Sequence, residues 1–238
     1  MPMIIACWNS ERHEPQAWQW QELKRRLLEA NPNVICCPEC WLDYFDSSWH
    51  PIFSEHLSGQ RNSQNERKIG LWSRNPWTNV DTVGSSEIPP GRFVRGTTEV
   101  EGTEIEVIGL CIPYAMSNVR VGRGGRTKWE EHRLYLQSLG ELIRPSLSRP
   151  TIVLGDFNQR IPRTKWGAKQ MAAMLEAALA EYRVWTEALL PGLEEPVVCH
   201  IAGSSHFALE RSWGETREHL GKPLSDHDGV FAEIGIKP

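Results

Sequence analysis

The sequence lacks the features that mark membrane-spanning and secreted proteins. Its 238 residues contain no apolar run of about 18 residues, the length expected of a membrane-spanning helix. The segment Met1-Pro2-Met3-Ile4-Ile5-Ala6 has neither the charged region nor the long apolar core of a signal peptide. We therefore expect a cytoplasmic protein whose 6 cysteines are reduced core residues.

Further absences narrow the class of protein. No internal repeat, low-complexity tract or linker divides the chain, so we predict a single domain over residues 1–238. The formal net charge of −4 argues against a protein that coats nucleic acid regardless of sequence, although a locally basic groove stays possible. Cys37 and Cys40 have zinc-ligand spacing, but only Cys199-His200 could complete such a site. We interpret these cysteines as core residues.

The patterns that are present indicate an α/β protein. Short apolar runs rich in β-branched residues alternate with segments of helical spacing. The predicted strands cover residues 4–8, 34–37, 69–74, 95–100, 104–112, 149–154, 184–186, 203–209 and 230–236, with a weak strand within 42–67. The predicted helices cover residues 16–30, 127–143 and 165–180. The 11 tryptophans are expected to serve mainly as core material.

The motif Gly155-Asp156-Phe157-Asn158 follows a predicted buried strand. Gly155 gives the backbone room to turn, and side chains two residues apart in extended backbone point the same way. Asp156 can accept a proton or hold a metal, while Asn158 can donate amide hydrogens to an anion without adding charge. An Asx turn in which both residues cap the backbone explains the same four residues equally well. The motif alone leaves both interpretations open.

Polar residues also lie at the ends of other predicted strands. Asn9 and Glu39 follow two strands joined by a helix, and ligands of layered α/β folds bind at such carboxyl ends. The whole set comprises Asn9, Glu39, Asp156, Asn158, Asp226 and His227. It can hold a hard divalent cation through oxygen ligands, donate to phosphate oxygens and move a proton near neutral pH. Each residue alone has a structural explanation; their conjunction predicts a phosphate site.

In this order, the motifs resemble the endonuclease/exonuclease/phosphatase superfamily, which includes pancreatic-type deoxyribonucleases, abasic-site endonucleases and inositol-phosphate phosphatases. The matching segments are Ala6-Cys7-Trp8-Asn9, Cys37-Pro38-Glu39, Ile69-Gly70-Leu71-Trp72-Ser73-Arg74, Gly155-Asp156-Phe157-Asn158 and Leu224-Ser225-Asp226-His227. The resemblance covers essentially the whole chain, and the last two segments together are its most specific part. It implies a four-layer α/β sandwich, in which two packed mixed β-sheets are flanked by helices.

The resemblance also implies metal-assisted hydrolysis of a phosphate ester, with Mg²⁺ or Mn²⁺ as the cofactor. Carried over by position, the metal ligands are Glu39, Asn9 and Asp226. Asp156 would orient or deprotonate the attacking water, and Asn158 would hold a phosphate oxygen. His227 would contact the scissile phosphate. Developing negative charge needs a cation and fixed donors more than a protein nucleophile, so these roles agree with the residue types.

Two positions depart from the family pattern. The family usually has a His or Tyr that contacts phosphate where this chain has Cys111, and Tyr114 is our candidate substitute. The family also has an Asp that pairs with the catalytic histidine. The best matching segment, residues 204–209, puts Ser205 in that place. A hydroxyl can hydrogen-bond the His227 imidazole but cannot compensate an imidazolium charge.

These observations favour a nuclease acting on DNA or RNA. A phosphomonoesterase or a lipid or small-molecule phosphodiesterase on the same scaffold stays an alternative, as does a phosphate-binding module weakened through Cys111 and Ser205. Arg120, Arg123 and Arg126 lie in a glycine-containing loop that could clamp a nucleic-acid backbone or simply be solvated. We expect a monomer without a membrane span, whose partner is a nucleic acid or another phosphodiester.

Overall fold

The computed structural model describes residues 2–56, 63–119, 125–165 and 167–237. In these ranges the α-helices are α1 (Trp18–Glu29), α2 (Glu130–Ile143) and α3 (Lys169–Ala178), and η1 (Arg144–Ser148) is a 3-10 helix. None of these helices has the length and apolar character needed to cross a bilayer.

Two six-stranded sheets form the centre of the molecule. The first sheet has the order β11-β14-β1-β2-β4-β3, with strands Met3–Cys7 (β1), Val34–Trp41 (β2), His50–Phe53 (β3), Glu66–Ser73 (β4), Phe207–Glu215 (β11) and Gly229–Ile236 (β14). The second has the order β5-β6-β7-β8-β10-β9, with strands Thr78–Asp81 (β5), Phe93–Val100 (β6), Thr103–Cys111 (β7), Thr151–Asp156 (β8), Arg183–Val184 (β9) and Cys199–Gly203 (β10). Both are mixed, because β1 and β2 run parallel, as do β7 and β8, among antiparallel neighbours. A small ribbon joins β12 (Glu218–His219) to β13 (Lys222–Pro223).

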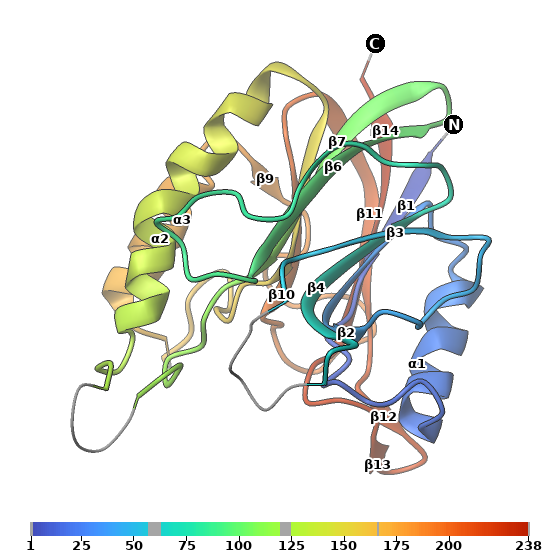
Figure 1. The fold of residues 1–238 in the computed structure, drawn as a ribbon, viewed down its shortest axis with the longest axis horizontal. Helices are drawn as coiled ribbons and strands as arrows, with labels where there is room; N and C mark the ends of the chain where they lie inside the picture. Colours follow the sequence, from blue (N-terminus) through green and yellow to red (C-terminus); the bar gives the residue numbers. More distant parts are fainter. Residues whose placement is uncertain (1, 57–62, 120–124, 166, 238) are drawn as a thin grey trace.

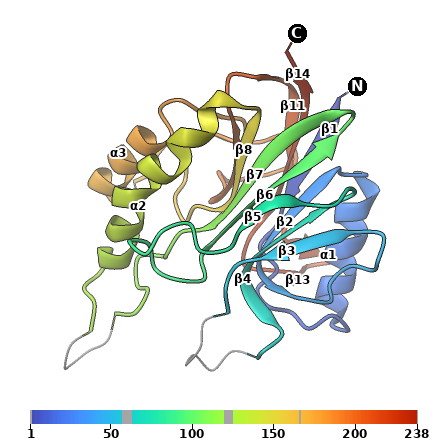
Figure 2. The ribbon, with the colours of Figure 1, turned by 45° about the horizontal axis from the view of Figure 1, so that its top comes forward.

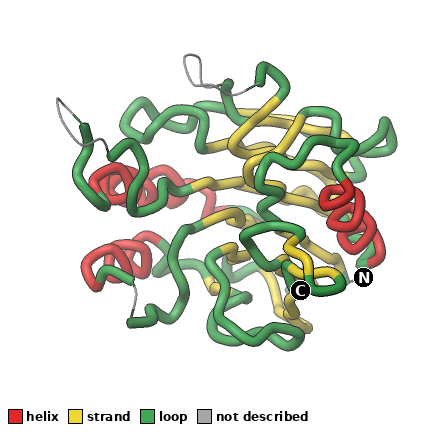
Figure 3. The backbone as a smooth tube through the Cα atoms, turned by 90° about the horizontal axis from the view of Figure 1, so that it is seen from below, coloured by secondary structure: helices red, strands yellow, loops and turns green. Residues whose placement is uncertain are grey.

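The elements stack in four layers (Figure 1). Helix α1 covers the first sheet, α2 and α3 cover the second, and the sheets pack against each other between them (Figures 2 and 3). Three apolar clusters fill the three interfaces, and side-chain alternation along each strand distributes residues between them. On β2, Cys36 points between the sheets while Ile35 packs under α1. The predicted four-layer α/β sandwich is thereby confirmed.

One predicted strand was wrong, and its error matters for the site. Residues 203–209 do not form one strand: they span the turn between β10 and β11. The true strand β10 begins at Cys199, pairs antiparallel with β8 and sets Cys199 opposite Asp156. The short apolar run from residue 199 to 203 carried this signal.

Gly155 is required for a reason other than the predicted turn. It lies inside β8, with a φ of 141° that L side chains rarely adopt. A Cβ atom there would lie 1.9 Å from the carbonyl oxygen of Leu110. The glycine therefore lets β7 and β8 approach closely just before Asp156.

Candidate active site

A cavity of about 470 Å³ opens at the ends of both sheets. It is lined by all six predicted polar residues, Asn9, Glu39, Asp156, Asn158, Asp226 and His227. Asn9 follows β1, Glu39 lies in β2 and Asp156 ends β8, while Asp226 and His227 immediately precede β14. Strand ends of both sheets therefore converge on one space.

Long-range hydrogen bonds fix the loops around this cavity. The indole Nε1 of Trp8 donates to the carbonyl of His227 at 2.8 Å. The hydroxyl of Ser225 donates to the carbonyl of Asn9 at 2.7 Å. The segment that carries His227 is thus tied to the end of β1, although more than 200 residues separate the two in sequence.

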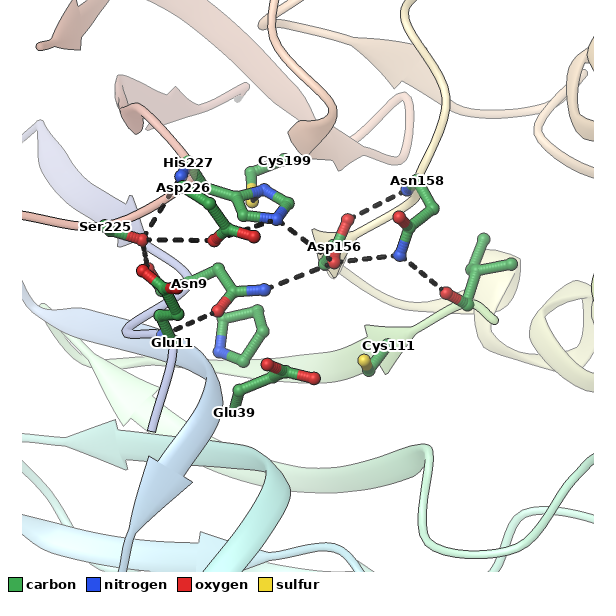
Figure 4. Close-up of polar contacts among 12 residues, drawn as sticks. Asn9, Glu11, Glu39, Cys111, Asp156, Asn158, Cys199, Ser225, Asp226 and His227 are labelled. Carbon is green, nitrogen blue, oxygen red and sulfur yellow. Dashed lines mark hydrogen bonds and ion pairs between the residues drawn. The ribbon is translucent and has the colours of Figure 1, made fainter. Parts of the chain in front are cut away.

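Asp156 is the hub of the site (Figure 4). Its Oδ1 accepts from the backbone N–H of Asn158 at 2.9 Å, and its Oδ2 accepts from the amides of Asn158 at 2.9 Å and Asn9 at 3.3 Å. The Nε2 atom of His227 lies 3.9 Å from Oδ2. Burial raises the pKa of Asp156, against the lowering effects of His227 and the hydrogen bonds. Its carboxylate is accordingly more basic than an exposed aspartate.

The shared orientation of Asp156 and Asn158 has a different origin from the one predicted. Asn158 is not extended: its φ of 52° places it in the left-handed region, and its N–H closes an Asx turn on Asp156. The Asn158 amide also donates to the carbonyl of Ile112 at 2.8 Å. Both of its amide hydrogens are therefore engaged, and a phosphate oxygen would have to replace one acceptor.

His227 lies between two carboxylates and a thiol. Its Nε2 is 3.4 Å from Oδ1 of Asp226, and its Nδ1 is 3.5 Å from Sγ of Cys199. Burial lowers the pKa of His227, but the charge of Asp156, aided by Cys199 and Asp226, raises it by more. The net shift is upward, which favours the imidazolium form at neutral pH.

Cys199, not Ser205, is the neighbour of His227 in the place expected for a supporting carboxylate. Ser205 is exposed in the turn after β10, at the opposite end of that strand from Cys199. The assignment of Ser205 was wrong because the predicted strand was displaced along the chain. Cys199 is buried and is the cross-strand partner of Asp156.

Glu39 is held by two basic side chains. Its Oε1 accepts hydrogen bonds from Nζ of Lys68 at 2.5 Å and from Nη2 of Arg12. The register of β2 and β4 places Lys68 opposite Glu39, since their neighbours Pro38–Ile69 and Cys40–Arg67 are paired. Burial raises the pKa of Glu39, but Lys68 and Arg12 lower it by more, so it is ionised at neutral pH.

The oxygen donors here fit a hard divalent cation. Glu39 Oε2 has no hydrogen-bond partner among the described residues, and the Asp226 side chain is 62% exposed beside the same cavity. Asn9 Oδ1 accepts one hydrogen bond, from Glu11 N–H at 2.9 Å, and keeps a second lone pair. Carboxylate and amide oxygens are the ligands preferred by Mg²⁺ and Mn²⁺.

Asp156, Cys199 and His227 form a second group with metal-ligand character, with ligand atoms within 4.8 Å of one another. Sulfur and nitrogen donors suit softer ions than Mg²⁺. However, His227 directs Nδ1 at Cys199 and Nε2 at Asp156, so its two ring nitrogens face different neighbours. We interpret this group as a unit held by the Cys199–His227 hydrogen bond and the His227–Asp156 ion pair.

The other predicted site residues have different surroundings. Tyr114 lines the cavity and is 54% exposed, so it stays a candidate. Arg126 is exposed and forms an ion pair with Glu130 at 2.7 Å. Arg120 and Arg123 lie outside the described residues.

The cysteines with zinc-like spacing, Cys37 and Cys40, lie in the apolar cluster under α1. They pack there with aromatic side chains such as Tyr44 and Trp72.

The sequence did not reveal three basic residues that line the cavity, Arg12, Lys68 and Arg92. Arg12 lies in the loop after Asn9, Lys68 lies inside β4 just before its apolar run, and Arg92 directly precedes β6. For Arg12 and Arg92 only a position near a strand could have pointed to the site, and many solvated residues share that position.

Comparison with known proteins identifies the family. Residues 7–187 match the Endonuclease/Exonuclease/phosphatase family. The chain belongs to this family. A comparison with curated protein sequences found no match to this chain.

Several solved structures share the fold of this chain at low sequence identity. The 3′ phosphatase NExo from Neisseria, bound to a product DNA hairpin, is 18% identical with a TM-score of 0.74, over 98% of this chain and 99% of that one. TDP2 from D. rerio, complexed with a single-strand DNA product, is 13% identical with a TM-score of 0.67, over 98% and 99%. The human Nocturnin catalytic domain with bound sulfate is 16% identical with a TM-score of 0.66, over 99% and 94%. Family members are metal-dependent phosphoesterases.

Proposed function

We propose that this chain is a divalent-metal-dependent phosphodiesterase, and specifically a nuclease acting on DNA or RNA. One observation carries the proposal: Asp156, hydrogen-bonded by Asn9 and Asn158 and adjacent to His227, shares a cavity with the ionised Glu39. Two proteins of the same fold, NExo and TDP2, are described with DNA products bound, which supports a nucleic-acid substrate.

The metal would be held by Glu39, with Asn9 and Asp226 supporting it through oxygen atoms. When bound, Mg²⁺ or Mn²⁺ supplies positive charge that stabilises the phosphoryl oxygens as negative charge develops on them. The remaining chemistry belongs to side chains of this chain.

Asp156 acts as the base toward the attacking water. Its raised pKa makes it a better proton acceptor, and the two asparagines orient both of its oxygens. In the overall reaction the water oxygen bonds to phosphorus and the ester oxygen leaves. One water proton passes to Asp156 and the other stays on the new P–OH group, while the departing oxygen takes up a proton from solvent, to which Asp156 afterwards releases its own.

His227 stabilises the transition state as an imidazolium. Its Nε2 atom lies on the cavity side, near Asp156 and Asp226, where it can donate to a nonbridging phosphate oxygen. Asn158 provides a neutral donor beside it once a phosphate oxygen replaces the Ile112 carbonyl as acceptor. Fixed donors of this kind are most valuable where charge develops.

The direct test is an assay of the purified protein with Mg²⁺ on plasmid, single-stranded DNA, RNA, a DNA 3′-phosphate and a chromogenic phosphodiester. We expect cleavage of a nucleic acid that stops in excess EDTA. If the protein only releases phosphate from the DNA 3′-phosphate, it is a phosphomonoesterase and not a nuclease. Cleavage of the small ester alone would indicate a small-molecule or lipid phosphodiesterase. Tight phosphate binding without turnover would indicate a binding module.

A further inference from the structure

Arg92 is a buried arginine whose position is fixed from several sides. Its carbonyl accepts hydrogen bonds from the Tyr135 hydroxyl at 2.9 Å and from the N–H of Cys111 at 3.1 Å. Its guanidinium donates from Nη1 to the carbonyl of Cys111 at 3.1 Å and from Nη2 to the hydroxyl of Ser117 at 3.3 Å. Arg92 is only 7% exposed, yet it lines the active-site cavity.

The charge of this guanidinium has no direct counter-charge in the described part of the chain. None of its hydrogen-bond acceptors is a carboxylate, and no Asp or Glu oxygen of the described residues lies within 4.0 Å of it. By contrast, Arg12 and Lys68 in the same cavity are both paired with Glu39. A buried charge loses its hydration, and it is stabilised only when an opposite charge comes close.

Arg92 is connected to the carboxylate of Glu131 only through the hydroxyl of Ser117. Ser117 donates to Oε2 of Glu131 at 2.5 Å, so Glu131 polarises the Arg92–Ser117 contact from a distance. Arg92 and Ser117 line the cavity, whereas Glu131 is not among its lining residues. The guanidinium is therefore supported from behind and can meet an anion on the cavity side.

Cys111 connects this charge to the reacting centre. It ends β7, and its register partner on β8 is Asp156. Its thiol lies 3.6 Å from Nη1 of Arg92, and Figure 4 shows it bordering the same space as Glu39 and Asp156. A small side chain at position 111 leaves room beside the guanidinium that a histidine or tyrosine would fill.

We propose that Arg92 binds nonbridging oxygens of the substrate phosphoryl group, and so supplies the phosphate contact expected from a larger side chain at Cys111. This assignment rests on the proposed function and adds a substrate-binding residue to it. A guanidinium suits the task because its planar N–H groups can grip two phosphate oxygens at once. Arg92 also brings a positive charge, which a tyrosine at position 111 would lack.

Binding of inorganic phosphate, measured by calorimetry on the full chain, tests the assignment independently of turnover. Arg92→Gln keeps neutral donors for Cys111 and Ser117 but removes the charge, and we expect it to weaken phosphate binding at least tenfold. Arg92→Lys keeps the charge but loses the fork and should lie between Arg92→Gln and wild type. The matched control is Arg95→Gln, because Arg95 is paired with Asp81 and does not line the cavity. It should bind phosphate as the wild type does.

A rescue separates a binding role from a purely structural one. Cys111→His in the Arg92→Gln background restores a donor at the same place, so phosphate affinity should recover by at least threefold and the KM of the active substrate should fall while kcat changes less. Unchanged phosphate affinity in folded Arg92→Gln and Arg92→Lys overturns the assignment, whatever the wild type hydrolyses. Phosphate binding that depends on Arg92 in a protein that cleaves no ester supports the assignment and rejects the proposed function alone.

Discussion

The two sheets contribute unlike walls to the cavity. On the wall from the first sheet, Glu39 is already matched by Arg12 and Lys68. On the wall from the second sheet, Asp156 is hydrogen-bonded by carboxamides and Arg92 by a carbonyl and a hydroxyl. A ligand must therefore exchange ion pairs at Glu39 on the first wall, whereas Arg92 on the second wall has no counter-charge among the described residues to give up. The first wall suits a cation and the second suits the phosphoryl group.

The largest effect should come from removing the base on the second wall. We expect Asp156→Asn to lower the hydrolysis rate at least about a hundredfold, because the amide cannot accept a proton from water. Burial disfavours the Asp156 charge, so the same substitution should not lower the free energy of unfolding. Hydrolysis rates of the wild type and of Asp156→Asn check the first expectation, and urea unfolding of the same two proteins checks the second. A folded variant with more than a tenth of the wild-type rate would contradict the assignment of Asp156 as base.

The second wall should also be sensitive to acid. Gln159 follows Asn158. Its side-chain Nε2 lies 2.7 Å from Nε2 of His132, and its backbone carbonyl oxygen lies 2.9 Å from Nε2 of His200. Burial lowers the pKa of His132 and of His200 to about 4, so both are neutral in the folded protein. In the unfolded chain the pKa of a histidine is about 6.5, so the unfolded chain takes up protons at higher pH than the folded protein does.

The contribution of these two histidines to the free energy of unfolding is therefore fully present above about pH 6.5, and it is lost as the pH falls through about 4. We expect a loss on the order of 3 kcal/mol for each histidine over this range. Unfolding by urea between pH 7 and pH 4 measures it for the wild type. His132→Gln removes one titrating group and should show a visibly shallower pH dependence. Identical slopes in the two proteins would contradict the neutral, buried state of His132.

The ion pairs that Glu39 forms with Arg12 and Lys68 on the first wall can be removed one at a time. Lys68→Gln removes a charge-assisted hydrogen bond to Glu39, so the free energy of unfolding should fall by about 1.5–3 kcal/mol. Saturating Mg²⁺ should reduce this loss, because a cation at Glu39 takes over the role of Lys68. Unfolding with and without Mg²⁺ checks both points. A loss that is the same in both conditions would mean that Lys68 and the metal do not share Glu39.

The smallest effects concern the neighbour of His227. We expect Cys199→Ala to slow hydrolysis less than tenfold, because a thiol sulfur is only a weak hydrogen-bond acceptor for the His227 imidazolium. Cys199→Asp should preserve or raise the rate, since a carboxylate holds an imidazolium better than a thiol does. The control, Ser205→Asp, alters an exposed turn and should change nothing. Steady-state rates of the three variants decide the matter: a response to Ser205→Asp alone would restore Ser205 as the partner.

The sequence predicted the fold well because its strands are short apolar runs and its helices have clear spacing. It also predicted that residues directly at strand ends, such as Asn9 and Asp156, come together around one cavity, because the carboxyl end of a strand locates its neighbours. Lys68, Arg92 and Cys199 were missed. Their contacts depend on the register of β4 beside β2, on the approach of the segment before β6, and on the true start of β10. Register and loop path arise from long-range packing, which no local pattern encodes.

In the proposed mechanism Glu39 holds a divalent cation that the reaction needs. A Mg²⁺ titration of the hydrolysis rate, run in parallel on the wild type and on Glu39→Gln with the best substrate from the panel, tests it most directly. We predict no turnover in excess EDTA and a saturable rate for the wild type. For Glu39→Gln we predict a rate at least about a hundredfold lower and a higher Mg²⁺ requirement. Full activity in EDTA, or the same Mg²⁺ dependence in both proteins, would contradict the account.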